Sequence, residues 1–184
     1  MAKLGLPVIL GLGLPQIDVI VNKWFASYVS SSAPAALNFA NRLMQVPLGI
    51  FAQAAGTAIL PMLAAYAARN ALDDMRSGVA YGLRAIMVES IPATVFIVVM
   101  ADPLVRTIYM SGEFRPSSVG LTVVPLIWYS VGIYAWAGQA IVARGFFALQ
   151  DTVTPVVIGT VSTIIFIPLN WILMHAMGTG GIAL

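Results

Sequence analysis

Residues Ala36 to Leu60 read ALNFANRLMQVPLGIFAQAAGTAIL, an apolar run long enough to cross a bilayer as one helix. Four polar side chains interrupt this run: Asn38, Asn41, Arg42 and Gln45. At about 100° per residue they fall on one side of a helix, which we call the polar stripe. Three more residues continue it: Gly49, Gln53 and Gly56. A guanidinium inside a bilayer costs roughly 2.5–3.5 kcal/mol on insertion scales, so the stripe is predicted to face a wet cavity that holds an anion.

Composition places nearly the whole chain in a membrane. The 184 residues are 60% hydrophobic and 9% charged, with a mean hydropathy of +0.93. Soluble domains carry about 25% charged residues. The sequence therefore predicts an all-α integral membrane protein in which residues 1–184 form a single membrane domain.

Several functional classes are disfavoured by what the sequence lacks. The net charge is only +2 and no Lys/Arg-rich run occurs, so no nucleic-acid partner is predicted. There are no cysteines and only one histidine, His175, which leaves no thiolate or histidine cluster for a metal. No phosphate-binding loop or catalytic triad pattern is present, so the chain is not predicted to be an enzyme and no cofactor is expected.

Hydropathy predicts about five transmembrane helices, over approximately 4–29, 36–60, 85–101, 119–143 and 154–176. Between the second and third, apolar residues recur at helical spacing, which predicts an interfacial amphipathic helix over about 66–83. Residues 180–184 look like the opening of a sixth helix, and the pattern suggests a piece of a larger transporter. In the last span four residues share a face that favours helix–helix contact: Thr152, Gly159, Thr163 and Asn170.

Basic residues in alternate connections predict the orientation in the membrane. One set falls on one side: Lys3, Arg69, Arg76, Arg84 and Arg144. Arg106 and Arg115 fall on the other. By the positive-inside rule the larger set is cytoplasmic, so the first helix runs outward.

A carboxylate lies within the first span. Asp18 and Asn22 are one turn apart, next to a segment that Gly11, Gly13 and Pro15 predict to be bent or unwound. An intramembrane carboxylate is a candidate functional group. The residues leave four roles open for Asp18: a structural pair with Arg42 at a kinked helix, a functional pair with Arg42, a Na⁺ ligand, or a proton carrier.

Two longer motifs resemble one known family. Residues 40–49 read ANRLMQVPLG and are followed by AILP at 58–61, which resembles a signature of the MurJ/MviN lipid II flippases. Residues 143–152 read ARGFFALQDT and are followed by TPV at 154–156, which is similar to the second motif of that family. The segments QID at 16–18 and WFAS at 24–27 also fit, and order and spacing agree across nearly the whole chain.

The resemblance implies a specific architecture and function. Family members have fourteen helices in two lobes of the MATE-like MOP superfamily, and this chain is similar to the seventh to eleventh helices. The family moves lipid II, an undecaprenyl-pyrophosphate-linked precursor of peptidoglycan, to the outer leaflet of the bacterial cytoplasmic membrane. The resemblance implies that Arg42 lies in the central cavity. It also implies three kinds of partner: lipid II or a similar lipid-linked pyrophosphate, membrane lipids, and an N-terminal lobe.

The sequence departs from the family pattern beside Arg42. Asn41 stands where members commonly have Asp, and Gln45 stands where some have Glu. Both differences remove negative charge from the stripe. Some members bind Na⁺ in this lobe, and Asp18 is a plausible ligand by position; Na⁺ and H⁺ are the candidate coupling ions.

The predicted substrate-binding set is therefore Arg42, Asn38, Asn41 and Gln45, and the predicted cation-binding set is Asp18 and Asn22. The function expected is lipid II translocation by alternating access. The alternatives are another MOP-type transporter, such as a polysaccharide-lipid flippase or a cation-coupled multidrug exporter, a non-transporting membrane scaffold, and a membrane enzyme acting on polyprenyl phosphates. A cationic drug favours a carboxylate-rich cavity over Arg42, so the charge of the stripe argues against the exporter.

Overall fold

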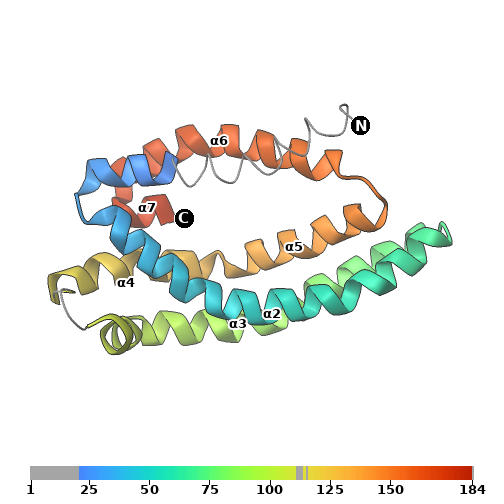
Figure 1. Ribbon diagram of the computed structural model, residues 1–184, viewed down its shortest axis with the longest axis horizontal. Coiled ribbons are helices and arrows are strands. Elements are labelled where there is room, and N and C mark those ends of the chain that lie inside the picture. Colours follow the sequence, from blue (N-terminus) through green and yellow to red (C-terminus); the bar gives the residue numbers. More distant parts are fainter. Residues whose placement is uncertain (1–20, 111–113, 115, 184) are drawn as a thin grey trace.

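The computed structural model describes residues 21–110, 114 and 116–183, and within this part of the chain every regular element is helical (Figure 1). Residues 21–29 are helical. The elements that follow are α2 (Ala33–Ala68), α3 (Leu72–Tyr109), α4 (Pro116–Val131), α5 (Ile133–Ala148), α6 (Val153–Met177) and α7 (Thr179–Ala183). The all-α prediction is confirmed.

The long helices run back and forth along the longest axis of the molecule (Figure 1). The α2–α3 and α5–α6 turns lie at one end, whereas the start of α2, the start of α4 and α7 lie at the other. Among the described residues, α3 and α6 are each long and apolar enough to cross a membrane, and two bent helix pairs raise the number of candidate spans to as many as four. The structure is that of a membrane protein.

The separate helix predicted over about 66–83 does not exist. Instead α2 continues to Ala68, the chain turns at residues 69–71, and α3 runs unbroken from Leu72 to Tyr109. Asn70 makes this turn with a φ of 52°, a left-handed conformation that Asn tolerates better than most residues. Gly78 and Gly82 do not break α3, because each packs directly against α2 side chains, Leu63 and Ile59 respectively. Small residues at such contacts let membrane helices approach closely.

The span predicted over 119–143 is two helices rather than one. Ser118–Val131 and Ile133–Ala148 meet at 44°, with Gly132 between them. The Thr94 hydroxyl of α3 donates to the Ser130 carbonyl at 2.9 Å, beside this break. The buried Ser130 hydroxyl donates to the Leu126 carbonyl at 2.6 Å. A hydroxyl from a neighbouring helix can therefore pair a backbone carbonyl next to the bend, as irregular backbone at membrane depth requires.

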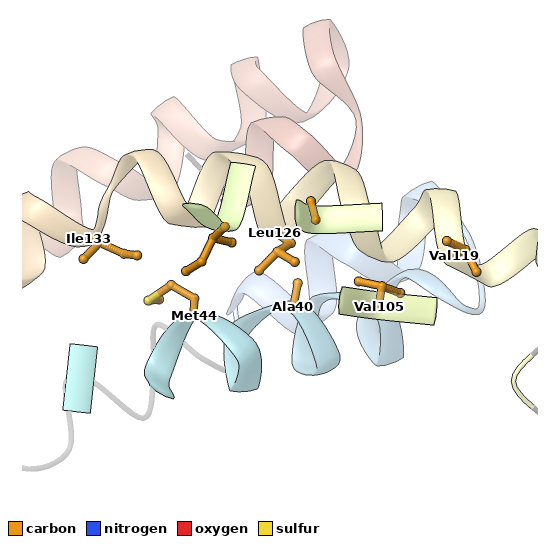
Figure 2. Close-up of a cluster of buried hydrophobic side chains, with 8 residues drawn as sticks. Ala40, Met44, Val105, Val119, Leu126 and Ile133 are labelled. Carbon is orange, nitrogen blue, oxygen red and sulfur yellow. The ribbon is translucent and has the colours of Figure 1, made fainter. Parts of the chain in front are cut away.

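Two of the apolar clusters that include α2 residues join this helix to α3, α4 and α5. Figure 2 shows the first, which joins α2, α3, α4 and the start of α5 through buried side chains that include Ala40, Met44, Val105, Val119, Leu126 and Ile133. The second joins α2, α3 and α5 through Ile59, Leu63, Met75, Ile86, Ala137 and Ile141. In the first half of α2 the buried residues lie on one side, so the opposite side of that half is left outside the packed bundle.

Candidate functional site

The first half of the polar stripe lies on the side of α2 that faces away from the bundle. Ala33, Leu37, Ala40 and Met44 are buried on the packed side. The side chains of Asn38, Arg42 and Gln45 are exposed, and Asn41 is half-buried. The structure thus brings all four predicted substrate-binding residues together along the first half of one helix.

The amides of the stripe are ordered by local hydrogen bonds. The Gln45 Nε2 donates to Asn41 Oδ1 at 2.5 Å, and the Asn38 Nδ2 donates to the Pro34 carbonyl at 2.8 Å. The Gln45–Asn41 bond occupies the carbonyl oxygen of Asn41 and leaves its amide nitrogen with no acceptor among the described residues. A primary amide nitrogen has two donors, so Asn41 can present N–H groups to an anion.

Arg42 has no carboxylate partner among the described residues. The ion pairs in this part of the chain are Arg76–Asp73, at 3.4 Å, and Arg106–Asp102, at 2.6 Å, and both lie on α3. From its first residue to its last, α2 contains no acidic residue. The suggested Arg42–Asp18 pair falls outside the described residues. The stripe therefore carries an exposed positive charge flanked by neutral amides, an arrangement suited to binding an anion.

The stripe does not stay open along its whole length. Gly49 has nothing within 4 Å of the position a Cβ would take. The same position at Gly56 is filled by the guanidinium of Arg144, so the stripe is covered by α5 at this point. Gln53 is part of the helix, but its side chain is not among those that the structure describes.

Arg144 lies inside α5 rather than in the connection where the sequence placed it. Its Nη1 donates to the Ala140 carbonyl at 3.4 Å, and its half-buried side chain reaches across to Gly56 of α2. Arg144 thus lies against the far end of the stripe. The family motif at 143–152 was the available signal for this residue, although nothing in the spacing connected it to Gly56.

The turn after α5 owes its shape to the same motif. Gln150 has a φ of 58°, and Asp151 Oδ1 accepts the backbone amides of Val153 and Thr154, both at 3.0 Å. These bonds satisfy amides in the first turn of α6. Hydrogen bonds from Thr154, first its side chain and then its amide, lower the pKa of Asp151 below its usual value.

The predicted cation-binding pair is described only in part, because Asp18 falls outside the described residues. Asn22 Oδ1 accepts a hydrogen bond from Nδ2 of the buried Asn170 at 3.0 Å. This bond joins the helix of residues 21–29 to α6, and Figure 1 shows the two side by side. The predicted helix–helix contact of Asn170 is confirmed, whereas Gly159, which has open space around it, makes no such contact.

Long apolar helices, with an exposed cationic and amide face on one of them, are the features of a helical membrane protein. A family model described as "Lipid II flippase MurJ" matches residues 1–184. The chain belongs to this family.

Individual relatives agree with the family match. The chain is 32% identical over 182 residues to a probable lipid II flippase MurJ of Vibrio cholerae, covering 97% of the chain and 34% of the relative. It is 28% identical over 178 residues to the lipid II flippase MurJ of Burkholderia cenocepacia, covering 97% and 34%. A solved structure titled "Lipid II flippase MurJ, inward closed conformation" shares the fold with a TM-score of 0.86 at 24% identity, covering 98% of this chain and 38% of that one. The chain spans about a third of the length of the curated relatives it matches.

Proposed function

We propose that this chain acts as part of a lipid II flippase in the bacterial cytoplasmic membrane. It would move the undecaprenyl-pyrophosphate-linked precursor to the outer leaflet without changing it chemically. Membership of the family supports this proposal, as do the apolar helices and the sign of the charge on α2. The cationic stripe, with no acidic residue on α2, favours an anionic cargo over the cationic drug of a multidrug exporter.

Arg42 is the centre of the proposed cargo site. Its planar guanidinium can give two parallel hydrogen bonds to a phosphate, and Asn38, Asn41 and Gln45 add neutral donors that do not cancel its charge. The observation that carries the proposal is that Arg42 is exposed and has no described carboxylate partner. Gly49 leaves space on the same face for the cargo.

The stripe would form one wall of a cavity between two lobes. The packed side of α2 is occupied by α3, α4 and α5, so only its exposed side can meet a second lobe. The relatives are about three times as long as this chain, which leaves ample length for an N-terminal lobe in them. Alternating access would follow from rocking of the lobes around the bound pyrophosphate, with the lipid tail outside them.

Coupling to Na⁺ or H⁺ through Asp18 and Asn22 is a separate part of the proposal. Asn22 already bonds Asn170, so a cation near Asn22 would also lie close to α6. In the full-length protein, Asp18→Asn should remove the dependence of transport on the coupling cation. Unchanged cation dependence would rule out this role for Asp18.

The cargo site is tested by lipid II translocation in vesicles that contain the full-length protein. Arg42→Ala should reduce the rate by tenfold or more, and Arg42→Lys should recover part of it because charge is restored without the planar fork. The matched control is Arg106→Ala, which removes an exposed arginine that pairs with Asp102 on α3 and is not part of the stripe. Equal rates for Arg42→Ala and Arg106→Ala would refute the proposed site.

A further inference from the structure

A pocket lies at the end of α6, outside the polar stripe. It has a volume of about 400 Å³ and is lined by Tyr28, Val29, Trp171, Met174, His175 and Gly178. No residue of α2 and no Lys, Arg, Asp or Glu belongs to this lining. We refer to it as the aromatic pocket.

Two helices end at the aromatic pocket. Asn22 contacts Asn170, Phe25 stacks near Trp171 with ring centroids 5.7 Å apart, and Tyr28 lines the pocket with His175. These contacts advance together along both helices, so the helix of residues 21–29 and α6 run parallel and end together, as Figure 1 also shows. The last carbonyls of a helix lack intrahelical partners, and its C-terminus carries roughly half a negative charge. Two such ends meet here, but α2 and α7 begin directly after them, so the attraction for a cation must come from the rings and the histidine.

The rings and the histidine provide the specific contacts for that cation. Tyr28 and Trp171 are 60% and 46% exposed, so each ring keeps surface that a bound cation can reach. His175 Nδ1 lies 2.8 Å from the Trp171 carbonyl. A carbonyl can only accept, so Nδ1 carries the proton, and in the neutral ring Nε2 is left as a hydrogen-bond acceptor.

The position of the pocket determines which cation can reach it. Val153–Met177 is apolar and long enough to span a membrane, and the pocket lies at its C-terminal end, where lipid headgroups meet water. We propose that the aromatic pocket binds the primary ammonium of a phosphatidylethanolamine headgroup. The ammonium sits against Tyr28 and Trp171 and donates a hydrogen bond to His175 Nε2.

Native mass spectrometry of the full-length protein tests this site independently of transport. The probes are phosphatidylethanolamine, phosphatidylcholine and phosphatidylglycerol with identical acyl chains. Phosphatidylethanolamine should bind about two- to fivefold more tightly than phosphatidylcholine, which cannot donate to Nε2, and phosphatidylglycerol should bind least because it has no ammonium. Equal binding of the three lipids would overturn the proposal.

Substitutions in the aromatic pocket test whether the lipid binds there. Trp171→Leu should weaken phosphatidylethanolamine binding about two- to fivefold. The matched control is Trp136→Leu on α5, because Trp136 is also 46% exposed but lies outside the pocket. His175→Phe should abolish the preference for phosphatidylethanolamine over phosphatidylcholine while leaving phosphatidylcholine binding intact, and this variant decides the question if Trp171→Leu fails to fold. A preference that survives His175→Phe, or equal losses in the two tryptophan variants, would contradict the assignment.

Discussion

Gly49 and Gly56 lie on the same stripe of α2 but have different surroundings. A side chain at Gly49 would enter open space, whereas one at Gly56 would meet the Arg144 guanidinium. We predict that Gly56→Val destabilises the protein by about 1–3 kcal/mol, the usual result of overpacking, because Arg144 must leave its place between α5 and α2. Thermal unfolding of the purified protein measures the difference.

Gly49→Val is the control for this prediction, since it adds the same side chain to the same helix without the collision. The two substitutions share any loss of helix propensity. Similar unfolding temperatures for both variants would mean that the Arg144–Gly56 contact contributes nothing to stability.

Asp151 gives the stability of the α5–α6 turn a defined pH dependence. Its folded pKa is lowered, chiefly by the hydrogen bonds from Thr154, so its contribution is present above the unfolded pKa and is lost as the pH falls through the folded pKa. Asp151→Ala should therefore unfold at a lower temperature than the parent protein above about pH 5, and the gap should close below about pH 3. A gap that is independent of pH would exclude the charged carboxylate as its source.

For single residues, the sequence predicted the side-chain exposure that depends on helical periodicity. The exposure of Asn38, Arg42 and Gln45 follows from their spacing within one helix. The contact of Arg144 with Gly56 does not, because it joins two helices far apart in sequence and depends on how α5 packs against α2. Whether the stripe binds cargo stays a prediction.

Among the elements, α3 is held in place by close glycine contacts. Gly82 lies under Ile59 of α2 and within 3.1 Å of Ile141 of α5, measured from the position of its missing Cβ. Gly82→Leu should push these three helices apart and destabilise the protein by about 1–3 kcal/mol. Gly120→Leu, at an α4 glycine with open space around it, should change stability far less. The unfolding temperatures of the two variants give the comparison, and a smaller loss for Gly82→Leu would contradict this packing.

A comparison of predicted and observed helix boundaries shows what hydropathy detects and what it misses. The last span was predicted over 154–176 and α6 is Val153–Met177, because that helix is apolar from end to end. The third was predicted over 85–101, yet α3 has 38 residues and is roughly 57 Å long at about 1.5 Å per residue. Hydropathy marks the stretch suited to lipid, whereas the charged first turns of α3 are helical because they pack on α2. The break at Gly132 was missed because apolar residues continue on both sides of it.

For the whole molecule, the decisive question is whether the stripe faces water. The chain contains no cysteine, so single cysteines report on one position at a time. In the full-length protein, Asn38→Cys and Gln45→Cys should react with a membrane-impermeant thiol reagent. Met44→Cys should be protected, since Met44 is only 1% exposed within the bundle. Equal protection at all three positions would favour a scaffold without a cavity.

The sequence predicted on which side the connections lie, but it did not predict which distant residues contact each other. Alternate connections were expected on the same side, and Figure 1 shows the α2–α3 and α5–α6 turns at the same end. Contacts between residues at opposite ends of the chain, among them the bond between Asn22 and Asn170, join α6 to residues 21–29. Spacing within a helix contains no information about such a pairing.

The hydrogen bond from Thr94 to the Ser130 carbonyl bears on the electrical insulation of the membrane. An interrupted helix usually recruits water to pair its open backbone groups, and a file of water conducts protons. Here a protein hydroxyl, 2.9 Å from the carbonyl, takes the place of that water. The carbonyl beside the bend between α4 and α5 therefore needs no water partner, which removes one position where a proton-conducting file of water could begin.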